Sequence, residues 1–273
     1  MPVYGNAQQA QQVALWLLEK LLKISISQIL LVSDLELTLH QSQLLEQWLD
    51  ELVNKHKPYQ YILGSVPFLD LDVLVEPPIL IPRLETEYWV NLLIQRFANF
   101  KNEQFKILDL CSGSGCIALS LAKFFRNSQV TAVDISHAAC DLIVKNLAHN
   151  QITNVEVLQS DLCQKLSSQK FDLIIANPPY IPKLVYDKLE PSVKLWEDQQ
   201  ALVSPDHDLA IIANIIKLAP EYLQAKCTPI SSLWLEVDST QGDSVNTLMQ
   251  GKFKQTELIL DQFGRPRVIV GKN

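Results

Sequence analysis

The chain has 273 residues, of which 48% are hydrophobic and 19% are charged. That is enough apolar material for one large domain or two of ordinary size. A formal net charge of −7 disfavours a protein whose main task is to bind nucleic acid, because phosphate contacts need a basic face. The N-terminus does not resemble a secretory signal, and no apolar run approaches the ~20 residues that cross a bilayer. We therefore expect an intracellular, soluble protein.

The first 59 residues are predicted to form a small, all-α helical-bundle domain. Val13, Leu17 and Leu21 recur every four residues, and a second apolar stripe follows on residues 44–53. Such stripes are typical of amphipathic helices whose apolar faces form a core.

Residues 60–82 are predicted to form a hairpin-like connector, because the apolar period shortens there and Gly64 and Pro67 interrupt it. From residue 83 to residue 273, strand and helix patterns alternate, which is typical of a doubly wound, mostly parallel sheet with both faces covered. The last two predicted strands are close enough in sequence to form an antiparallel hairpin. The predicted strands are 105–110, 129–134, 155–161, 171–176, 231–237, 256–261 and 267–271, and the predicted helices are 116–125, 137–150, about 206–224 and one from about 241.

A possible nucleotide pocket follows the first of these strands. Gly113, Gly115 and Ala118 fit the G-x-G-x-x-G/A fingerprint, in which glycine lets the backbone approach a ligand closely. Asp134 ends the second strand, about 20 residues later, where an acid can bind both hydroxyls of an adenosine ribose. Asp161 closes the third strand and could accept a hydrogen bond from an adenine amino group or cap the next segment. These strand ends are expected to face one crevice.

Both NAD and S-adenosylmethionine carry adenosine, so ribose recognition does not separate them. Asp109 precedes the first glycine by four residues, where it can help to place a cationic amino-acid group rather than a pyrophosphate. The fourth strand ends in Asn177-Pro178-Pro179-Tyr180, for which a hydride-transfer enzyme has no evident use. Both features favour S-adenosylmethionine.

The Asn-Pro-Pro-Tyr segment resembles the signature of methyltransferases that modify planar –NH2 groups. Such a nitrogen is a poor nucleophile because its lone pair is delocalised. The Asn177 side-chain oxygen and the Pro178 carbonyl can each accept one N–H and so orient the lone pair toward the methyl group. Pro178 and Pro179 hold these acceptors rigidly, and Tyr180 can stack on the planar target.

Several motifs in order resemble the HemK/PrmC family, which methylates the N5 atom of a glutamine in class-1 peptide chain release factors. The resemblance implies a Rossmann-like, seven-stranded class I methyltransferase domain at 83–273, after a helical substrate-recognition domain (1–59) and the connector (60–82). The chain departs from the family pattern at Leu84, Leu162, Asp238 and residues 205–208. The segments that carry the resemblance are 58–87, 108–122, 177–182, 196–204, 235–245 and 263–273.

The resemblance also implies site residues. The implied catalytic residues are Asn177, Pro178, Pro179 and Tyr180. The implied cofactor-binding residues are Asp109, Cys111, Ser112, Gly113, Ser114, Gly115, Asp134, Asp161, Leu162 and Asn177. The implied contacts of the target glutamine, which lies in a Gly-Gly-Gln loop, are Asn177, Pro178, Pro179, Tyr180, Arg83 and Glu85.

The expected cofactor is S-adenosylmethionine, with S-adenosylhomocysteine as product. No metal is expected, because the five histidines are scattered and the five cysteines include no Cys-x-x-Cys pair, which indicates free thiols. The expected partner is a folded release factor, met by a monomer in the cytoplasm or, alternatively, in the mitochondrial matrix. No direct contact with nucleic acid or with a membrane is expected.

Two other functions stay open at this point. An adenine-N6 methyltransferase would be expected to carry a basic cleft and an added target-recognition segment, and the sequence shows neither. A non-catalytic or NAD-binding Rossmann protein would bind NAD in place of S-adenosylmethionine.

Overall fold

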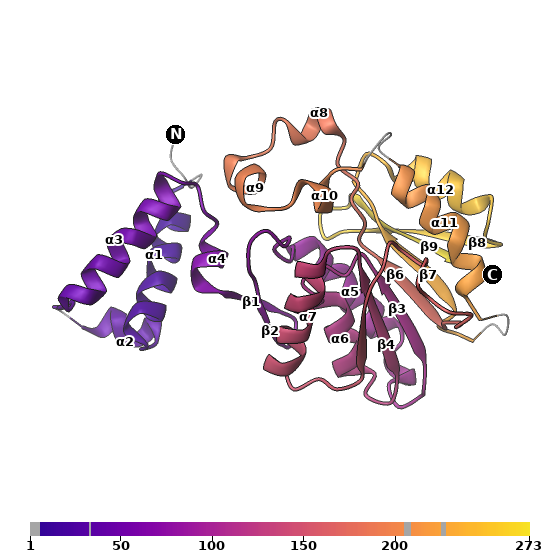
Figure 1. Cartoon of the computed structure of the whole chain (residues 1–273), viewed down its shortest axis with the longest axis horizontal. Coiled ribbons are helices and arrows are strands. Elements are labelled where there is room, and N and C mark those ends of the chain that lie inside the picture. Colours follow the sequence, from indigo (N-terminus) through magenta and orange to yellow (C-terminus); the bar gives the residue numbers. More distant parts are fainter. Residues whose placement is uncertain (1–5, 33, 205–208, 225–227) are drawn as a thin grey trace.

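A seven-stranded sheet organises the larger part of the chain (Figure 1). The structure, a computed structural model, describes residues 6–32, 34–204, 209–224 and 228–273. The strand order is β5-β4-β3-β6-β7-β9-β8. β9 runs antiparallel to both β7 and β8, whereas the other described pairs of this sheet are parallel, so the predicted terminal hairpin is confirmed. The strands are β3 (Lys106–Leu110), β4 (Gln129–Asp134), β5 (Val155–Gln159), β6 (Leu173–Ala176), β7 (Ser232–Glu236), β8 (Gln255–Leu260) and β9 (Pro266–Lys272).

Helices cover both faces of this sheet, as the alternating pattern predicted. Along β7, Trp234 packs into the cluster under α5, α6 and α7, whereas Leu233 and Leu235 pack into the cluster under α11 and α12. This alternation follows from the two-residue period of a strand, and it buries apolar side chains on each face. The helices are α5 (Leu84–Arg96), α6 (Cys116–Phe124), α7 (His137–His149), α11 (Ala210–Tyr222) and α12 (Gly242–Gln250).

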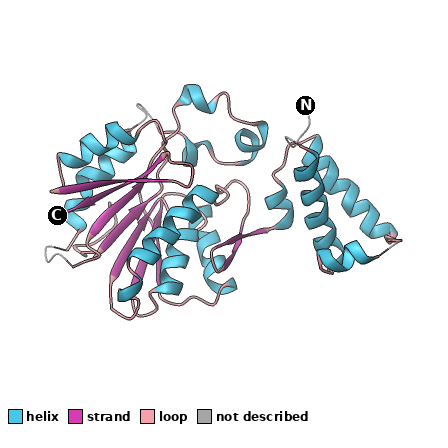
Figure 2. Ribbon diagram, turned by 180° about the vertical axis from the view of Figure 1, so that it is seen from behind, coloured by secondary structure: helices cyan, strands magenta, loops and turns pink. Residues whose placement is uncertain are grey.

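The N-terminal helices form a separate small core beside the sheet domain (Figure 2). Val13 and Leu17 pack against Leu52 and Ile62 there. The stripe predicted on residues 44–53 belongs to this core only in part, because Leu49 is 43% exposed. The helices of this module are α1 (Ala7–Leu22), α2 (Ile26–Leu31), α3 (Leu39–Val53) and α4 (Tyr59–Leu63).

The connector was predicted to be extended throughout, but its first residues are helical. Helix α4 runs through its first residues, because Tyr61 and Ile62 bury their side chains and Gly64, at φ 81°, ends the turn. The hairpin of β1 (Ser65–Phe68) and β2 (Leu71–Leu74) then follows as predicted. Asn146 of α7 holds it, since its Oδ1 accepts from the Leu74 N–H at 2.6 Å and its Nδ2 donates to the Leu74 carbonyl at 3.0 Å.

Some elements escaped prediction. Helix α5 was missed, although its buried Trp89, Val90 and Leu93 follow helical spacing. The predicted helix at 206–224 is confirmed from Ala210 onward; residues 205–208 lie outside the described part of the chain. No helix among the described residues is long and apolar enough to cross a membrane. The short helices that were also missed are η1 (Ala98–Phe100), α8 (Lys183–Tyr186), α9 (Pro191–Trp196) and α10 (Gln199–Leu202).

Candidate active site

Four neighbouring strands end at one edge of the sheet and bring the predicted residues together. The ladder pairs Leu110 of β3 with Val133 of β4 and with Ala176 of β6, and it pairs Ala176 with Leu235 of β7. The next residue on each strand is Cys111, Asp134, Asn177 and Glu236. Strand β3 has β4 on one side and β6 on the other, which makes this edge the switch point where open α/β sheets bind ligands.

The glycine loop takes a left-handed backbone at Cys111, Gly113 and Gly115, with φ of 59°, 55° and 83°. A Cβ on Gly113 would meet nothing within 4 Å, so this part of the loop is open to close approach. A Cβ on Gly115 would lie 2.8 Å from Leu119 and 3.0 Å from Ile143. The first glycine thus leaves space for a ligand, and the second lets α6 pack against α7.

Ser112 and Ser114 hold the loop in place and are themselves buried. The Ser112 hydroxyl lies 2.9 Å from the Asp109 carbonyl and accepts from the Val133 N–H at 3.0 Å. The Ser114 carbonyl accepts from Asn146 Nδ2 at 3.0 Å. Asn146 thus connects the loop to the β1–β2 hairpin, a role that the sequence analysis did not find, since a lone asparagine on a helix is a weak signal.

Asp109 is fully buried and only half satisfied. Its Oδ2 accepts from the Ala118 N–H at 3.2 Å, while its Oδ1 has no partner within the described residues. Burial raises the pKa of this carboxyl from 3.8 to about 7. A buried carboxylate oxygen without a donor is costly by itself, so a cationic or N–H-bearing ligand would find a prepared partner there.

Asp134 lies at the open side of the same loop. Its Oδ2 accepts from the Gly113 N–H at 2.8 Å and its Oδ1 accepts from the Ser136 N–H at 2.9 Å. Burial raises the pKa of Asp134. Each carboxylate oxygen can accept a second hydrogen bond, so both remain available to a diol such as ribose.

The two residues predicted at the end of the third strand are less enclosed. Asp161 is exposed, and its Oδ2 accepts from the Gln164 side chain at 2.7 Å. Leu162 is half-buried and takes φ 44°, an uncommon backbone for a non-glycine residue. A direct role of Asp161 and Leu162 in holding a cofactor stays a prediction.

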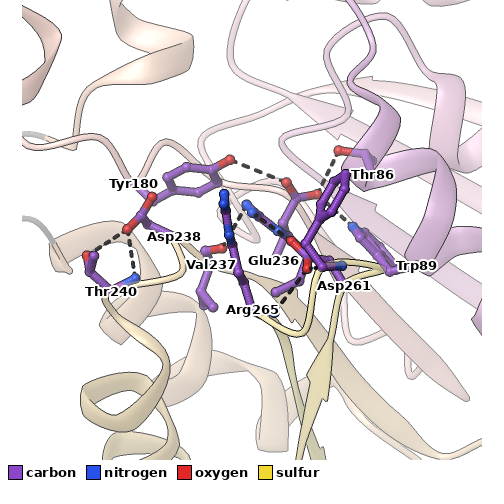
Figure 3. A network of polar contacts seen from close by, with 11 residues as sticks. Thr86, Trp89, Tyr180, Glu236, Val237, Asp238, Thr240, Asp261 and Arg265 are labelled. Atoms are coloured by element: carbon purple, nitrogen blue, oxygen red, sulfur yellow. Dashed lines mark hydrogen bonds and ion pairs between the residues drawn. The ribbon is translucent and has the colours of Figure 1, made fainter. Parts of the chain in front are cut away.

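A buried polar network is centred on Glu236 and includes Thr86, Trp89 and Tyr180 (Figure 3). Asn177 joins this network through Thr86. The Asn177 contact is the outermost of these. The Asn177 Nδ2 lies 3.3 Å from Thr86 Oγ1, and the Thr86 hydroxyl donates to Glu236 Oε2 at 2.8 Å. The same Oε2 accepts from the Trp89 indole N–H at 2.7 Å, while Oε1 lies 3.3 Å from the Tyr180 hydroxyl. Burial raises the pKa of Glu236, against the opposing effect of these donors.

The acceptors predicted in the Asn-Pro-Pro-Tyr segment have no hydrogen-bond donor in the part of the chain that the structure describes. Among the described residues, neither Asn177 Oδ1 nor the Pro178 carbonyl accepts a hydrogen bond. The Tyr180 carbonyl, by contrast, accepts from Gln241 Nε2 at 2.9 Å. Pro178 and Pro179 are buried, which fixes the segment between its two polar ends. Stacking of Tyr180 on a target group stays a prediction.

Arg83 and Glu85, the other predicted substrate contacts, lie at the start of α5. Arg83 Nη2 pairs with Glu197 Oε2 at 2.5 Å, and the Glu197 side chain is 1% exposed. Arg83 therefore ties α5 to the segment after α9. Glu85 is half-buried in the first turn of α5. No contact in the structure tests their predicted role.

Thr86, Trp89 and Glu236 were not predicted. Thr86 and Trp89 lie on the helix that was missed, but Glu236 carried a usable signal, because it is an acid within a buried strand, as Asp109 is. The described residues contain no group of three His, Cys, Asp or Glu side chains that could hold a metal. Cys111, Cys116, Cys140 and Cys163 are free thiols; Cys227 lies outside the described residues.

Comparison with known proteins places this site in a family. The Methyltransferase small domain matches residues 89–230, and the PrmC N-terminal domain matches residues 5–64. A release factor glutamine methyltransferase of Fusobacterium nucleatum is 38% identical over 80% of this chain, which spans 60% of that relative's length. The protein of the same name in Thermodesulfovibrio yellowstonii is 32% identical, over 97% of this chain and 92% of its own.

A solved structure shares the fold. The T. thermophilus 16S rRNA methyltransferase, in complex with AdoMet and guanosine, aligns with a TM-score of 0.55 and 17% identity, over 77% of this chain and 49% of that one. At this identity the likeness concerns the fold alone.

The buried carboxyl group of Asp109 is expected to make the stability of the protein depend on pH. The carboxyl ionises near 3.8 when unfolded and near 7 when folded, so the folded state holds the proton more tightly and ionisation on raising the pH costs stability. Replacing Asp109 by Asn removes this titration. We expect the free energy of unfolding of the wild type to fall, relative to Asp109→Asn, by about 2 kcal/mol between about pH 5.5 and pH 8.5.

Urea unfolding at several pH values measures this difference. Asp141→Asn, which removes an exposed carboxylate from α7, controls for the loss of one charge. Parallel pH profiles for the wild type and Asp109→Asn would show that Asp109 titrates alike in both states.

Proposed function

The chain belongs to the release factor glutamine methyltransferase family, and on that premise we propose that it transfers a methyl group from S-adenosylmethionine to the N5 atom of a glutamine. The target is the glutamine of the Gly-Gly-Gln loop of a class-1 peptide chain release factor, so the activity supports translation termination. The observation that carries this proposal is the free Asn177 amide oxygen, next to the glycine loop at the switch point of the sheet.

The residues around the glycine loop fit S-adenosylmethionine. Asp109 Oδ1, which has no partner among the described residues, would complement the cationic amino-acid end, and the open side of Gly113 would let the cofactor approach the backbone. Asp134 would hold the ribose hydroxyls with the lone pairs that Gly113 and Ser136 leave free. When bound, this group supplies an electrophilic methyl carbon. Asp161 and Leu162 would line the adenine end.

Asn177 and Pro178 prepare the target nitrogen. The Asn177 Oδ1 and the Pro178 carbonyl each accept one N–H of the glutamine amide, which turns its lone pair away from them and toward the methyl donor. Acceptors fixed in advance favour the transition state, because the nitrogen gains positive charge as it reacts. Pro179 makes the segment rigid, and Tyr180 supplies a planar surface for the amide.

The helical domain (residues 1–59) and the connector (60–82) recognise the folded release factor, while residues 83–273 carry the chemistry. Support comes from large apolar side chains that are exposed on this domain: Leu31 of α2 is 86% exposed and Leu39 of α3 is 77% exposed. A protein partner that covered these side chains would gain the free energy of their burial. Remote binding of this kind places one glutamine in the pocket.

The function is tested by mass spectrometry of a release factor after incubation with the enzyme and S-adenosylmethionine. We expect one added methyl group on the Gly-Gly-Gln glutamine. Asn177→Ala should bind the cofactor as the wild type does and lose most of the transfer, mainly in kcat, because its acceptor acts in the transition state. Turnover of Asn177→Ala near the wild-type rate would refute the role of Asn177, and an unmodified glutamine would refute the substrate.

Asp134→Ala is expected to weaken the binding of S-adenosylmethionine and S-adenosylhomocysteine alike. Two ribose hydroxyls and the Gly113 N–H would lose a charged acceptor, at about 1.5–3 kcal/mol. Isothermal calorimetry with both ligands measures the loss. Unchanged affinity for both would shift the ribose role to Asp161.

Leu31→Glu is expected to separate protein recognition from chemistry. A charge in the apolar surface of the helical domain should lower kcat/KM for an intact release factor by about tenfold, since burial of a leucine side chain stabilises by about 1.5–3 kcal/mol. A free Gly-Gly-Gln peptide should react as it does with the wild type. Val144→Glu, on the 55% exposed Val144 of α7, is the matched control and should change neither substrate. An unchanged kcat/KM of Leu31→Glu for the intact release factor would mean that this surface of the helical domain does not recognise it.

A further inference from the structure

The network behind Asn177 has a fixed hydrogen-bond direction. An indole N–H can only donate, so the Trp89 contact at 2.7 Å requires Glu236 Oε2 to act as an acceptor. An ionised carboxylate has no proton to give, so the Thr86 hydroxyl, 2.8 Å from the same oxygen, also donates to it. Since a hydroxyl has one proton, Thr86 Oγ1 has only lone pairs left for its other neighbour, Asn177.

This direction decides which end of the Asn177 amide faces the protein. Only the –NH2 end can donate to the Thr86 lone pair, so Nδ2 lies at 3.3 Å from Thr86 and Oδ1 points away from it. Asn177 Oδ1 has no partner among the described residues and is not fully buried, so it is accessible at the site. An amide turned by 180° would present its –NH2 end to the –NH2 group of the target, donor against donor.

We propose that Thr86 and Glu236 are positioning residues that set the direction of the Asn177 amide, so that its oxygen meets the target –NH2 group. The inference rests on the proposed function for the role of Asn177 as acceptor. Thr86 comes from the first turn of α5, and Glu236 comes from the end of β7, next in register to Asn177.

The surroundings keep this arrangement rigid. Thr86 is 2% exposed, and Glu236 and Trp89 are each 1% exposed, so water does not compete for these hydrogen bonds. The Trp89 ring is stacked on Trp234 with the ring centroids 6.5 Å apart. The Tyr180 hydroxyl contacts Oε1 of the same carboxylate, so Glu236 anchors both ends of the Asn-Pro-Pro-Tyr segment, one directly and one through Thr86.

The test compares Thr86→Val, which keeps the shape and removes the hydroxyl, with Thr86→Ser, which keeps the hydroxyl. We expect Thr86→Val to lower kcat for release factor methylation about tenfold, with KM for the release factor and Kd for S-adenosylmethionine unchanged. Thr86→Ser should restore kcat to within about twofold of the wild type. Thr86→Ala removes the same hydroxyl without adding bulk, and it decides the matter if Thr86→Val does not bind the cofactor.

A double variant separates positioning from a merely structural role. In the Asn177→Ala background, Thr86→Val should cause no further loss of the residual rate, because Thr86 acts through Asn177. A full tenfold further loss there would overturn the proposal, and so would a wild-type kcat in Thr86→Val or Thr86→Ala. If Asn177→Ala itself kept wild-type activity, the acceptor role in the proposed function would fail. If Asn177→Ala lost activity but the Thr86 variants did not, only the positioning role of Thr86 would fail.

Discussion

The buried carboxylate of Glu236 is the interaction on which the arrangement of this site depends. A charged group removed from water needs donors, and here they come from α5 and from the segment after β6. Satisfying one carboxylate therefore brings together a helix, a strand end and the Asn-Pro-Pro-Tyr segment. Arg83 secures the start of the same helix through its ion pair with Glu197. The free acceptors of Asn177 and Pro178 are held by this framework.

Two buried carboxylates at one sheet edge thus serve different purposes. Glu236 has donors on both oxygens, which offset the cost of its burial and link α5 to the segment after β6. Among the described residues Asp109 has a donor on Oδ2 alone, and its pKa is raised because burial disfavours the charged form. Buried polar groups without a protein partner concentrate where ligands bind. The carboxylate of Asp109 therefore fits a binding site, whereas the carboxylate of Glu236 fits the framework that supports it.

Specific polar contacts join the helical module to the sheet domain. Trp196 of α9 donates its indole N–H to the Lys55 carbonyl at 2.8 Å, and Lys57 lies over the same ring at 5.2 Å from its centroid. On the other side, Asn146 joins the hairpin to the glycine loop. The helical module is thus held to α9, and the hairpin that follows it is held to the glycine loop.

Local patterns in the sequence determined the seven strands, the glycine loop, Asp134 and the Asn-Pro-Pro-Tyr segment, because each depends on periodicity or on neighbouring residues. Only the tertiary structure revealed the network around Glu236, whose partners Thr86 and Trp89 lie 150 and 147 residues away along the chain. It also showed that Arg83 is ion-paired. A hydrogen bond between distant residues leaves no periodic trace, since its direction and burial arise only when the sheet and α5 pack together.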